Sequence, residues 1–246
     1  MLAVLLPALI LLAVTHAEPA IAQDRNAAAR ARMVAQIAAM ARETGAETGR
    51  PRFGDAVMAA MGKVPRHRFV PFVQELFAYE NRPLPIGENQ TISQPYIVAL
   101  MTELLDPKPT DTVLEVGTGS GYKAAVLAEL VAKVYTIEIV EPLAKRAMRT
   151  LGQLGYGNVE VRIGDGYGGW TQAAPFDSII VTAAPATIPQ PLIDQLKPGG
   201  RMVIPVGSSG DVQQLLLVEK RPDGTTTTKR TLTVRFVPLT RHPAAK

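Results

Sequence analysis

The sequence predicts an α/β fold of the doubly wound, Rossmann-like kind, with a mostly parallel sheet, a C-terminal antiparallel hairpin and N-terminal helices. Three observations predict it. From residue 111 onward, apolar segments of strand length alternate with helical segments. One of these strands runs directly into a glycine-rich loop that opens a helix. A chain of 246 residues, 47% of them apolar and 20% charged, is long enough for one large core and excludes a disordered or fibrous protein.

The residue inventory excludes several functional classes. The absence of Cys rules out a disulfide framework, a thiolate metal site and a cysteine nucleophile. Three His, at positions 16, 67 and 242, are too few and too scattered for a histidine metal site. A net charge of +4 with 5% aromatic residues gives no dense basic stripe interleaved with aromatics. We therefore expect no metal and no nucleic-acid partner.

The N-terminus predicts a targeting segment. Residues 3–14 form an apolar run that is too short to span a bilayer, which takes ~20 residues, and Ala20-Ile21-Ala22 fits a cleavage site. We interpret residues 1–22 as a secretory signal peptide, so that the protein is exported to the periplasm without a stable membrane anchor. No Lys or Arg precedes the run, which leaves open an upstream start or a non-functional signal with a cytoplasmic protein. A buried N-terminal helix is the alternative, although Pro7 and Pro19 oppose a long one.

Residues 23–246 are interpreted as a single domain, with a helical segment over 23–106 and a Rossmann-like core over 107–246. Helical spacing of apolar residues predicts a helix over 26–44 and a second over 54–61. The stretch 80–92 is expected to be irregular because it holds Pro and Gly. Ser93-Gln94-Pro95 then opens a helix, with Ser93 able to cap it and Pro95 in its first turn.

The core segment is predicted to continue as alternating strands and helices. Strands are expected over residues 112–116, 134–139, 159–163, 178–182 and 202–206, with a hairpin of 213–220 and 227–237. Helices are expected over 120–132, 141–154 and 191–196. Pro198-Gly199-Gly200 is expected to end the last helix, and Pro222-Asp223-Gly224 to turn the hairpin.

The glycine loop indicates the class of ligand. Gly117, Gly119 and Gly121 read G-x-G-x-G, whereas a dinucleotide fingerprint reads G-x-G-x-x-G. Glu115 stands two residues before the loop, where a carboxylate would repel a pyrophosphate but could pair with an ammonium group. Glu138 ends the next strand, where an acid accepts both hydroxyls of a ribose.

Together these features specify a ligand with a cation, a ribose and no phosphate, a description that S-adenosylmethionine fits. Asp165, after the third strand, is placed to accept a hydrogen bond from the adenine amino group, or is a simple turn residue. The alternative for Glu115 and Glu138 is that both are solvated strand ends.

Several segments resemble known motifs. LEVGTGSGY (114–122) resembles motif I of class I S-adenosylmethionine-dependent methyltransferases. The segments 64–71, 85–105, 164–170, 174–185, 192–207 and 234–240 resemble one family within that class, the protein-L-isoaspartate O-methyltransferases. The most diagnostic is TISQP (91–95), and the resemblance runs from about residue 30 to residue 241.

The resemblance implies methyl transfer from S-adenosylmethionine to the α-carboxyl of L-isoaspartyl residues in damaged proteins or peptides. The ester then closes to a succinimide, and hydrolysis returns some normal aspartyl. It implies a catalytic position at Ser93 and a peptide site at Ser93, Gln94 and Val237. It implies a set of cofactor-binding residues: Ile92, Glu115, Gly117, Gly119, Gly121, Glu138, Asp165, Gly166 and Thr240.

The reaction asks little acid–base chemistry of the protein, because a carboxylate with a pKa of ~3.5 is already ionised at neutral pH. We therefore expect Ser93 to orient the acceptor by a hydrogen bond. Two positions depart from the family pattern: Asn89 replaces a glycine, and Ile139 replaces a basic residue that often follows the ribose acid. We expect a monomer. An exported methyltransferase for another acceptor, or a non-catalytic binding protein, remain the alternative functions.

Overall fold

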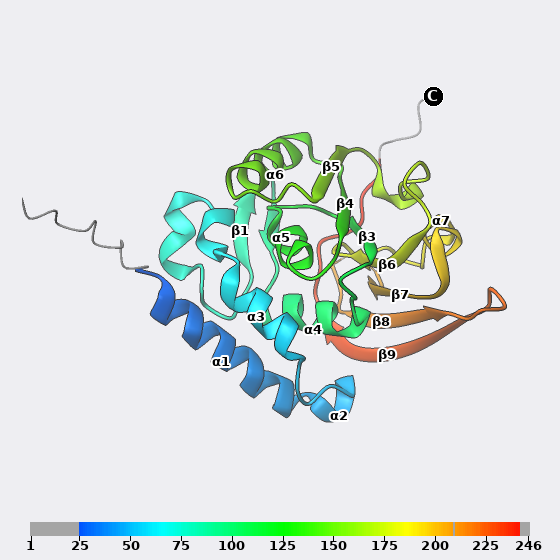
Figure 1. Ribbon diagram of the computed structural model, residues 1–246, viewed down its shortest axis with the longest axis horizontal. Coiled ribbons are helices and arrows are strands. Elements are labelled where there is room, and N and C mark those ends of the chain that lie inside the picture. Colours follow the sequence, from blue (N-terminus) through cyan, green and yellow to red (C-terminus); the bar gives the residue numbers. More distant parts are fainter. Residues whose placement is uncertain (1–24, 209, 242–246) are drawn as a thin grey trace, which may run out of the picture.

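A seven-stranded sheet forms the centre of the computed structural model, which describes residues 25–208 and 210–241 (Figure 1). Its strands, in spatial order, are β5 (Val159–Ile163), β4 (Lys133–Glu138), β3 (Thr112–Val116), β6 (Phe176–Val181), β7 (Leu196–Val206), β8 (Gln213–Lys220) and β9 (Thr226–Val234). The strands from β5 to β7 are parallel, and β8 and β9 are antiparallel. The predicted fold class is confirmed. The chain order reverses beside β3, which is where such sheets bind ligands.

Seven α-helices and three short 3₁₀ helices lie in the described residues. They are α1 (Ala27–Glu43), α2 (Gly45–Thr48), α3 (Asp55–Lys63), η1 (Arg66–Phe69), η2 (Phe72–Phe77), α4 (Pro95–Leu105), α5 (Tyr122–Ala128), α6 (Glu141–Gln153), η3 (Gly166–Gly168) and α7 (Gln190–Asp194). None of them is long and apolar enough to cross a membrane. The predicted signal segment, residues 1–22, lies outside the described residues.

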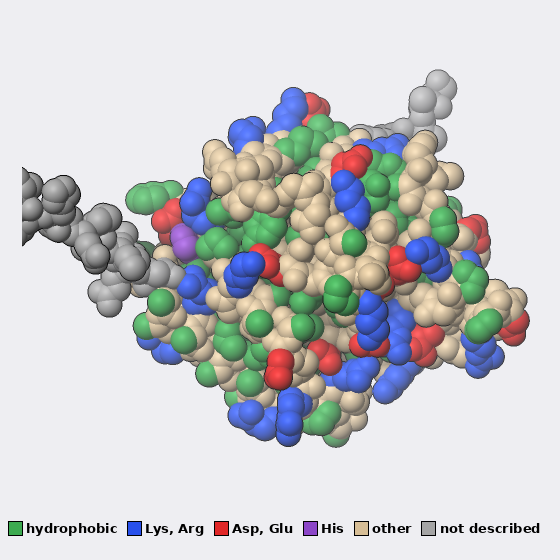
Figure 2. Space-filling model, in the orientation of Figure 1, with side chains coloured by type: hydrophobic (Ala, Val, Ile, Leu, Met, Phe, Trp, Pro, Cys, Tyr) green, Lys and Arg blue, Asp and Glu red, His purple; other side chains and the backbone are tan. Residues whose placement is uncertain are grey.

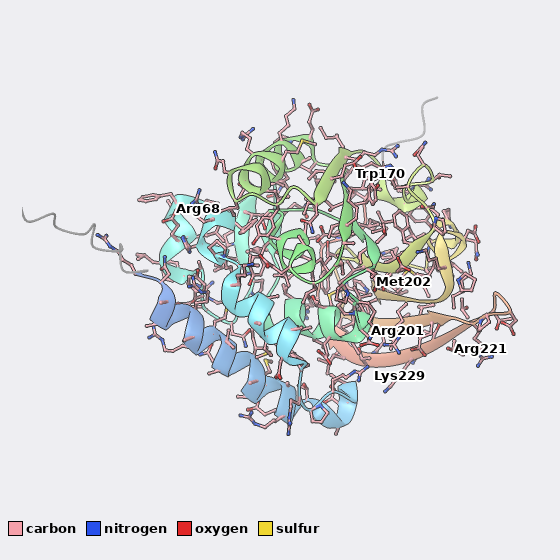
Figure 3. The ribbon with its side chains drawn as sticks, in the orientation of Figure 1. Arg68, Trp170, Arg201, Met202, Arg221 and Lys229 are labelled. Carbon is pink, nitrogen blue, oxygen red and sulfur yellow. The ribbon has the colours of Figure 1, made fainter. Side chains whose placement is uncertain are left out.

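The sheet buries a different set of side chains on each face, because successive residues of a strand point in opposite directions. In β3, Val113 joins the core beneath α1, α3, α4, α5 and α6, whereas Leu114 points to the other side. In β7, Val203 likewise joins the first core, and Met202 points to the other face. The second face is covered by α7 and by the segment carrying Trp170 (Figure 3). The N-terminal helices thus share one continuous core with the sheet.

Three sequence predictions are corrected. Residues 80–92 are not wholly irregular, because β1 (Leu84–Gly87) and β2 (Gln90–Ile92) form a hairpin. Its turn places Glu88 and Asn89 at positive φ, a backbone conformation that Asn tolerates better than most residues. The segment 198–200 does not end a helix but lies within β7, whose first residue pairs with Phe176 of β6. The helix predicted over 120–132 is shorter, because the chain turns after Ala128 to reach β4.

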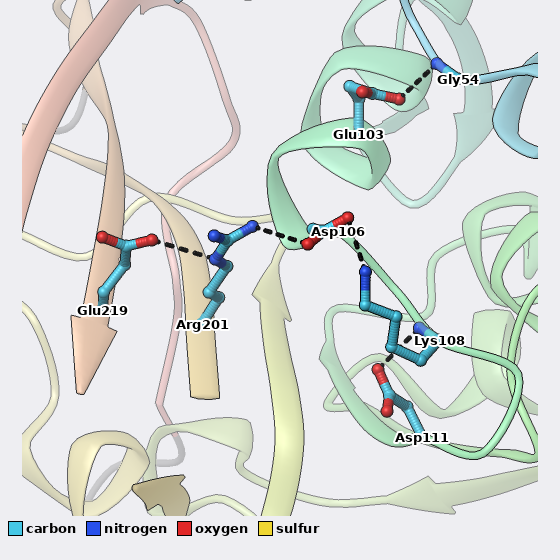
Figure 4. Close-up of polar contacts among 7 residues, drawn as sticks. All are labelled: Gly54, Glu103, Asp106, Lys108, Asp111, Arg201 and Glu219. Carbon is cyan, nitrogen blue, oxygen red and sulfur yellow. Dashed lines mark hydrogen bonds and ion pairs between the residues drawn. The ribbon is translucent and has the colours of Figure 1, made fainter. Parts of the chain in front are cut away.

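A polar network fixes α4, which carries the residues after Ser93, against the sheet (Figure 4). The helix ends at Asp106, whose φ of 53° turns the chain. The Asp106 carboxylate pairs with Lys108 at 2.9 Å and with Arg201 of β7 at 3.3 Å. Arg201 in turn pairs with Glu219 of β8 at 3.0 Å. The end of α4 is therefore linked by ion pairs to β7, and through β7 to β8.

Candidate active site

The glycine loop after β3 passes so close to β6 that only glycine fits at its first position. Gly117 has a φ of +97°, and a Cβ there would lie 2.4 Å from Thr182 Oγ1. That hydroxyl donates to the carbonyl oxygens of Gly117 at 2.6 Å and Val116 at 3.1 Å. Gly119 also has a positive φ, of +54°. Both glycines, with Thr118 between them, line a pocket at the carboxyl end of the sheet, which we call the cofactor pocket.

Gly121, predicted to bind the cofactor, lies at the start of the next helix. It is the N-cap residue of α5 at a φ of +88°. A Cβ there would lie 3.2–3.3 Å from side-chain atoms of Leu151 and Ala147 on α6, and Gly121 does not line the pocket. Its position is therefore explained by close packing of the loop against α6.

Glu138 binds the loop from the neighbouring strand. Its Oε2 accepts a hydrogen bond from Gly119 N–H at 2.7 Å, and its Oε1 accepts one from Val140 N–H at 2.9 Å. Glu138 as a whole is 7% exposed and lines the cofactor pocket. Each oxygen keeps one further lone pair for a ligand hydroxyl. The two backbone donors fix both oxygens in place, and the carboxylate suits a ligand with two hydroxyl groups.

Glu115 lies in the wall of the same pocket and is completely buried. Its Oε2 accepts from Thr136 Oγ1 at 2.6 Å, while its Oε1 has no hydrogen-bond partner within the described part of the chain. Burial raises the pKa of the Glu115 carboxyl to about 8, and the Thr136 hydrogen bond and the charge of Lys123 oppose that rise. A buried acid with an unpartnered oxygen suits a cationic ligand, so the residues fit S-adenosylmethionine.

Lys123 is a site residue that the sequence analysis missed. It stands on α5, and its ammonium group is buried, donating to Val98 carbonyl oxygen at 2.7 Å and Thr102 Oγ1 at 3.2 Å. Burial lowers the pKa of the Lys123 amine to about 7, and the charge of Glu115 opposes this shift. The available signal was a lone cation in the otherwise uncharged helix YKAAVLA.

Ser93 stands where the hairpin ends and α4 begins, and it does not cap the helix. Gln94 occupies the cap position. The Tyr96 N–H in the first turn donates instead to Asn81 Oδ1 at 2.9 Å. Ser93 and Ile92 both line the cofactor pocket. The Ser93 hydroxyl is consequently not used by the helix and remains available to a substrate.

The C-terminal segment closes the cofactor pocket from the far end of the chain. Ala184, after β6, donates its N–H to Val237 carbonyl oxygen at 2.8 Å and accepts from Leu239 N–H at 2.9 Å. This parallel bridge brings Val237 and Thr240 into the pocket lining beside the glycine loop. Both predicted positions therefore join the site.

Asp165 stands beside the cofactor pocket but does not line it. Its Oδ1 accepts from Tyr167 N–H at 2.8 Å, capping η3, and its Oδ2 pairs with Arg241 Nε at 3.3 Å. The Arg241 guanidinium also lies 4.3 Å from the centre of the Tyr167 ring. Gly166 does line the pocket, and a Cβ there would lie 2.5 Å from Val116 Cγ1.

A second pocket adjoins the first and shares part of its wall. Thr91, Ser93, Thr182 and Val237 line both. The second pocket continues to Gln94, a predicted peptide-binding residue, and to Arg235 after the end of β9, which the sequence analysis missed. Among the residues that the structure describes, Arg235 is the only charged side chain in its lining. We call it the acceptor pocket.

The comparisons with known proteins agree with this geometry. The profile of the protein-L-isoaspartate(D-aspartate) O-methyltransferase family matches residues 48–244. The chain belongs to this family. A protein-L-isoaspartate O-methyltransferase of Polaromonas sp. strain JS666 is 63% identical over 208 residues, which cover 85% of this chain and 99% of that protein. One of Cupriavidus necator strain H16 is 61% identical over 218 residues, covering 89% and 84%.

Solved structures are similar too. A protein-L-isoaspartate O-methyltransferase superposes with a TM-score of 0.71 at 27% identity, covering 83% of this chain and 65% of that protein's length. A Plasmodium falciparum protein solved with S-adenosyl-L-homocysteine gives a TM-score of 0.72 at 22% identity, covering 86% and 98%, and shows the shared fold.

Family membership confirms the predicted activity, methylation of isoaspartyl residues, and the predicted cofactor, S-adenosylmethionine. Within the described residues no three His, Asp or Glu side chains gather closely enough to hold a metal ion.

Proposed function

We propose that the two joined pockets carry out the family's reaction, the transfer of a methyl group from S-adenosylmethionine to the α-carboxylate of an L-isoaspartyl residue. The observation that carries this assignment is the shared wall. Glu115, Glu138 and Lys123 line the cofactor pocket, and Arg235 lines the acceptor pocket. The two pockets meet at Thr91, Ser93, Thr182 and Val237. The cofactor pocket therefore suits a cationic ligand, and the adjoining acceptor pocket suits an anionic one.

In the cofactor pocket, Glu138 accepts the ribose hydroxyls while its backbone partners hold it still. Glu115 faces the cationic end through its unpartnered oxygen. Gly117, Gly119 and Gly166 let the backbone approach the ligand, because they present no side chain. Ile92 and Thr240 cover it from the hairpin and from the C-terminal segment. Asp165, which stays a proposed adenine partner, keeps a free lone pair on Oδ2 beside its contact with Arg241.

In the acceptor pocket, the Ser93 hydroxyl donates to one oxygen of the isoaspartyl carboxylate and directs the other toward the methyl group. Gln94 and the backbone at Val237 contact the peptide on either side. S-adenosylmethionine supplies an activated methyl whose carbon–sulfur bond breaks as the carboxylate oxygen forms its new bond to carbon. Alignment of this kind lowers a barrier by about 7–11 kcal/mol. No base is needed, because the acceptor is already ionised.

The test measures transfer of labelled methyl to a peptide with one isoaspartyl residue, beside the same peptide with aspartyl. We expect transfer to the first only. In Glu138→Gln, the Gln side-chain amide would face a backbone donor, so we expect cofactor affinity to fall about tenfold or more. Methylation of both peptides alike would favour a different acceptor. Cofactor binding without any transfer would favour a non-catalytic binding protein.

Export is a second proposal, and the apolar run over 3–14 followed by Ala20-Ile21-Ala22 supports it. The protein then works in the periplasm as a mature chain that begins at Gln23. N-terminal sequencing of protein recovered from the periplasmic fraction tests this. A cytoplasmic protein that keeps residues 1–22 would refute it. Sedimentation velocity on the same sample tests the predicted monomer.

A further inference from the structure

We propose that the protein docks reversibly onto an anionic lipid surface through an apolar patch on η2, outside both pockets. The patch consists of four neighbouring side chains: Phe72, 84% exposed, Val73, 74%, Leu76, 92%, and Phe77, 40%. None of them lines the cofactor or the acceptor pocket. Soluble monomers rarely leave such a group of large apolar side chains in water unless it meets a partner.

The patch lies where the described chain begins. Arg30, in the first turn of α1, donates to the hydroxyl of Tyr79 at 3.4 Å, and Tyr79 follows η2 by two residues. His67, just before η2, contacts the same hydroxyl at 2.8 Å. In Figure 1 the cyan segment that holds η2 accordingly stands beside the blue start of α1.

The chain that precedes α1 carries its own apolar run, residues 3–14. The ten residues between that run and Arg25 span at most about 35 Å. When the run enters a membrane during the proposed export, Arg25 is therefore within that distance of the same membrane, and the patch stands at the same end of the molecule (Figure 1). The patch then gives the folded protein a second apolar contact with the lipid, beside the apolar run.

The charges around the patch suit lipid headgroups. Arg25 and Arg68 are exposed, and neither guanidinium group has an ion-pair or hydrogen-bond partner within the described residues. Arg68 lies at the same end of the molecule as the patch (Figure 3). Glu75 on η2 is the opposing acid, whereas the nearby Glu80 is engaged by Arg82 at 2.6 Å. Figure 2 shows blue side chains between the green ones at this end.

A lipid surface fits this combination better than a second copy of the chain. Two copies meeting patch to patch would bring like-charged Arg68 side chains toward each other. An anionic bilayer offers headgroups to the arginines and an apolar interior to the phenylalanines and the leucine at the same time. Interfacial segments with Phe and Leu beside Arg bind membranes in this way.

The test is co-sedimentation of the purified full chain with phosphatidylcholine vesicles that contain 0 or 30% phosphatidylglycerol. Leu9→Asp/Leu11→Asp, which breaks the apolar run, is the background in which the patch acts alone. In it we compare Phe72→Ser/Leu76→Ser, the charge reversal Arg68→Glu, and Val212→Ser, an exposed apolar residue elsewhere on the surface. Thermal unfolding and isoaspartyl methylation check that every variant is folded.

We expect binding to anionic vesicles that falls roughly tenfold or more in Phe72→Ser/Leu76→Ser and is unchanged in Val212→Ser. Arg68→Glu should weaken binding to the anionic vesicles only. The proposal is overturned if the background protein does not bind vesicles, or if Phe72→Ser/Leu76→Ser binds as well as its parent. It is also overturned if these substitutions abolish a concentration-dependent dimer while vesicle binding stays the same.

Discussion

Replacing Gly117 with Ala tests how the glycine loop is held, and its cost can be worked out from the structure. A φ of +97° is unfavourable for Ala by about 1–2 kcal/mol. The new Cβ would lie 2.4 Å from Thr182 Oγ1, so that hydroxyl must rotate away from the Gly117 and Val116 carbonyls. Losing this hydrogen bonding costs about 0.5–1.5 kcal/mol more.

The total, about 1.5–3.5 kcal/mol, corresponds to a melting temperature lower by roughly 3–14 °C in a chain of this size. Urea denaturation measures the free energy directly. Gly155→Ala is the matched control, because Gly155 has a φ of +80° with nothing within 4 Å of its would-be Cβ. That variant should lose only the stability that corresponds to the positive φ, about 1–2 kcal/mol.

A double-mutant cycle isolates the contact part. In a Thr182→Ala background the hydroxyl is gone, and the next atoms of residue 182 lie an ordinary 3.7 Å from the new Cβ. Gly117→Ala should then cost about 1 kcal/mol less than in the wild type. If the penalty is the same in both backgrounds, or if Gly117→Ala is as stable as the wild type, the close approach to Thr182 does not constrain the loop.

Three further predictions concern charge and the acceptor. Ser93→Ala should lower turnover roughly 10–100-fold and leave cofactor affinity unchanged, as measured by methylation kinetics and calorimetry; unchanged turnover removes Ser93 from the mechanism. Arg235→Gln should raise KM for isoaspartyl peptides at low salt but not at 0.5 M NaCl, with the exposed Arg230→Gln as control; a salt-independent effect contradicts charge attraction. Burial raises the pKa of Glu115 from 4.5 to about 8, so this group destabilises the fold progressively as pH rises between those values. Urea denaturation of Glu115→Gln at pH 5 and pH 8 should therefore show a change in unfolding free energy, relative to wild type, that is more favourable at pH 8; an equal change refutes the buried charge.

The strands were predictable because each is a short apolar run that ends at a turn signal. The bounds of β3 and β5 agree with their predictions, since both are set by the local alternation of sequence. The hairpin of β1 and β2 was missed because it holds Pro85 and depends on pairing that only the folded chain supplies. Local patterns likewise could not show that 198–200 would extend β7 along β6.

The site was predictable where the chemistry is local and not where it depends on contacts between distant segments. Glu138 and Gly117 follow from their spacing around one strand and loop. Lys123 becomes significant only because folding buries it in the pocket wall with Glu115, and Arg235 only because the end of β9 passes the shared wall. Gly121 was assigned by motif alone, and its packing on α6 is a property of the tertiary structure.

Whether a residue lines one pocket or both should decide which kinetic constant its substitution changes. In the proposed reaction, a residue that lines one pocket alone, such as Glu138 or Arg235, contacts one reactant, so its loss should change mainly the affinity for that reactant. Ser93 and Thr182 line both pockets, and in the proposed reaction the carboxylate oxygen meets the methyl carbon beside them. Their loss disturbs alignment, which matters chiefly in the transition state and therefore appears in turnover. The division of effects between KM and kcat should thus follow the division of the lining residues.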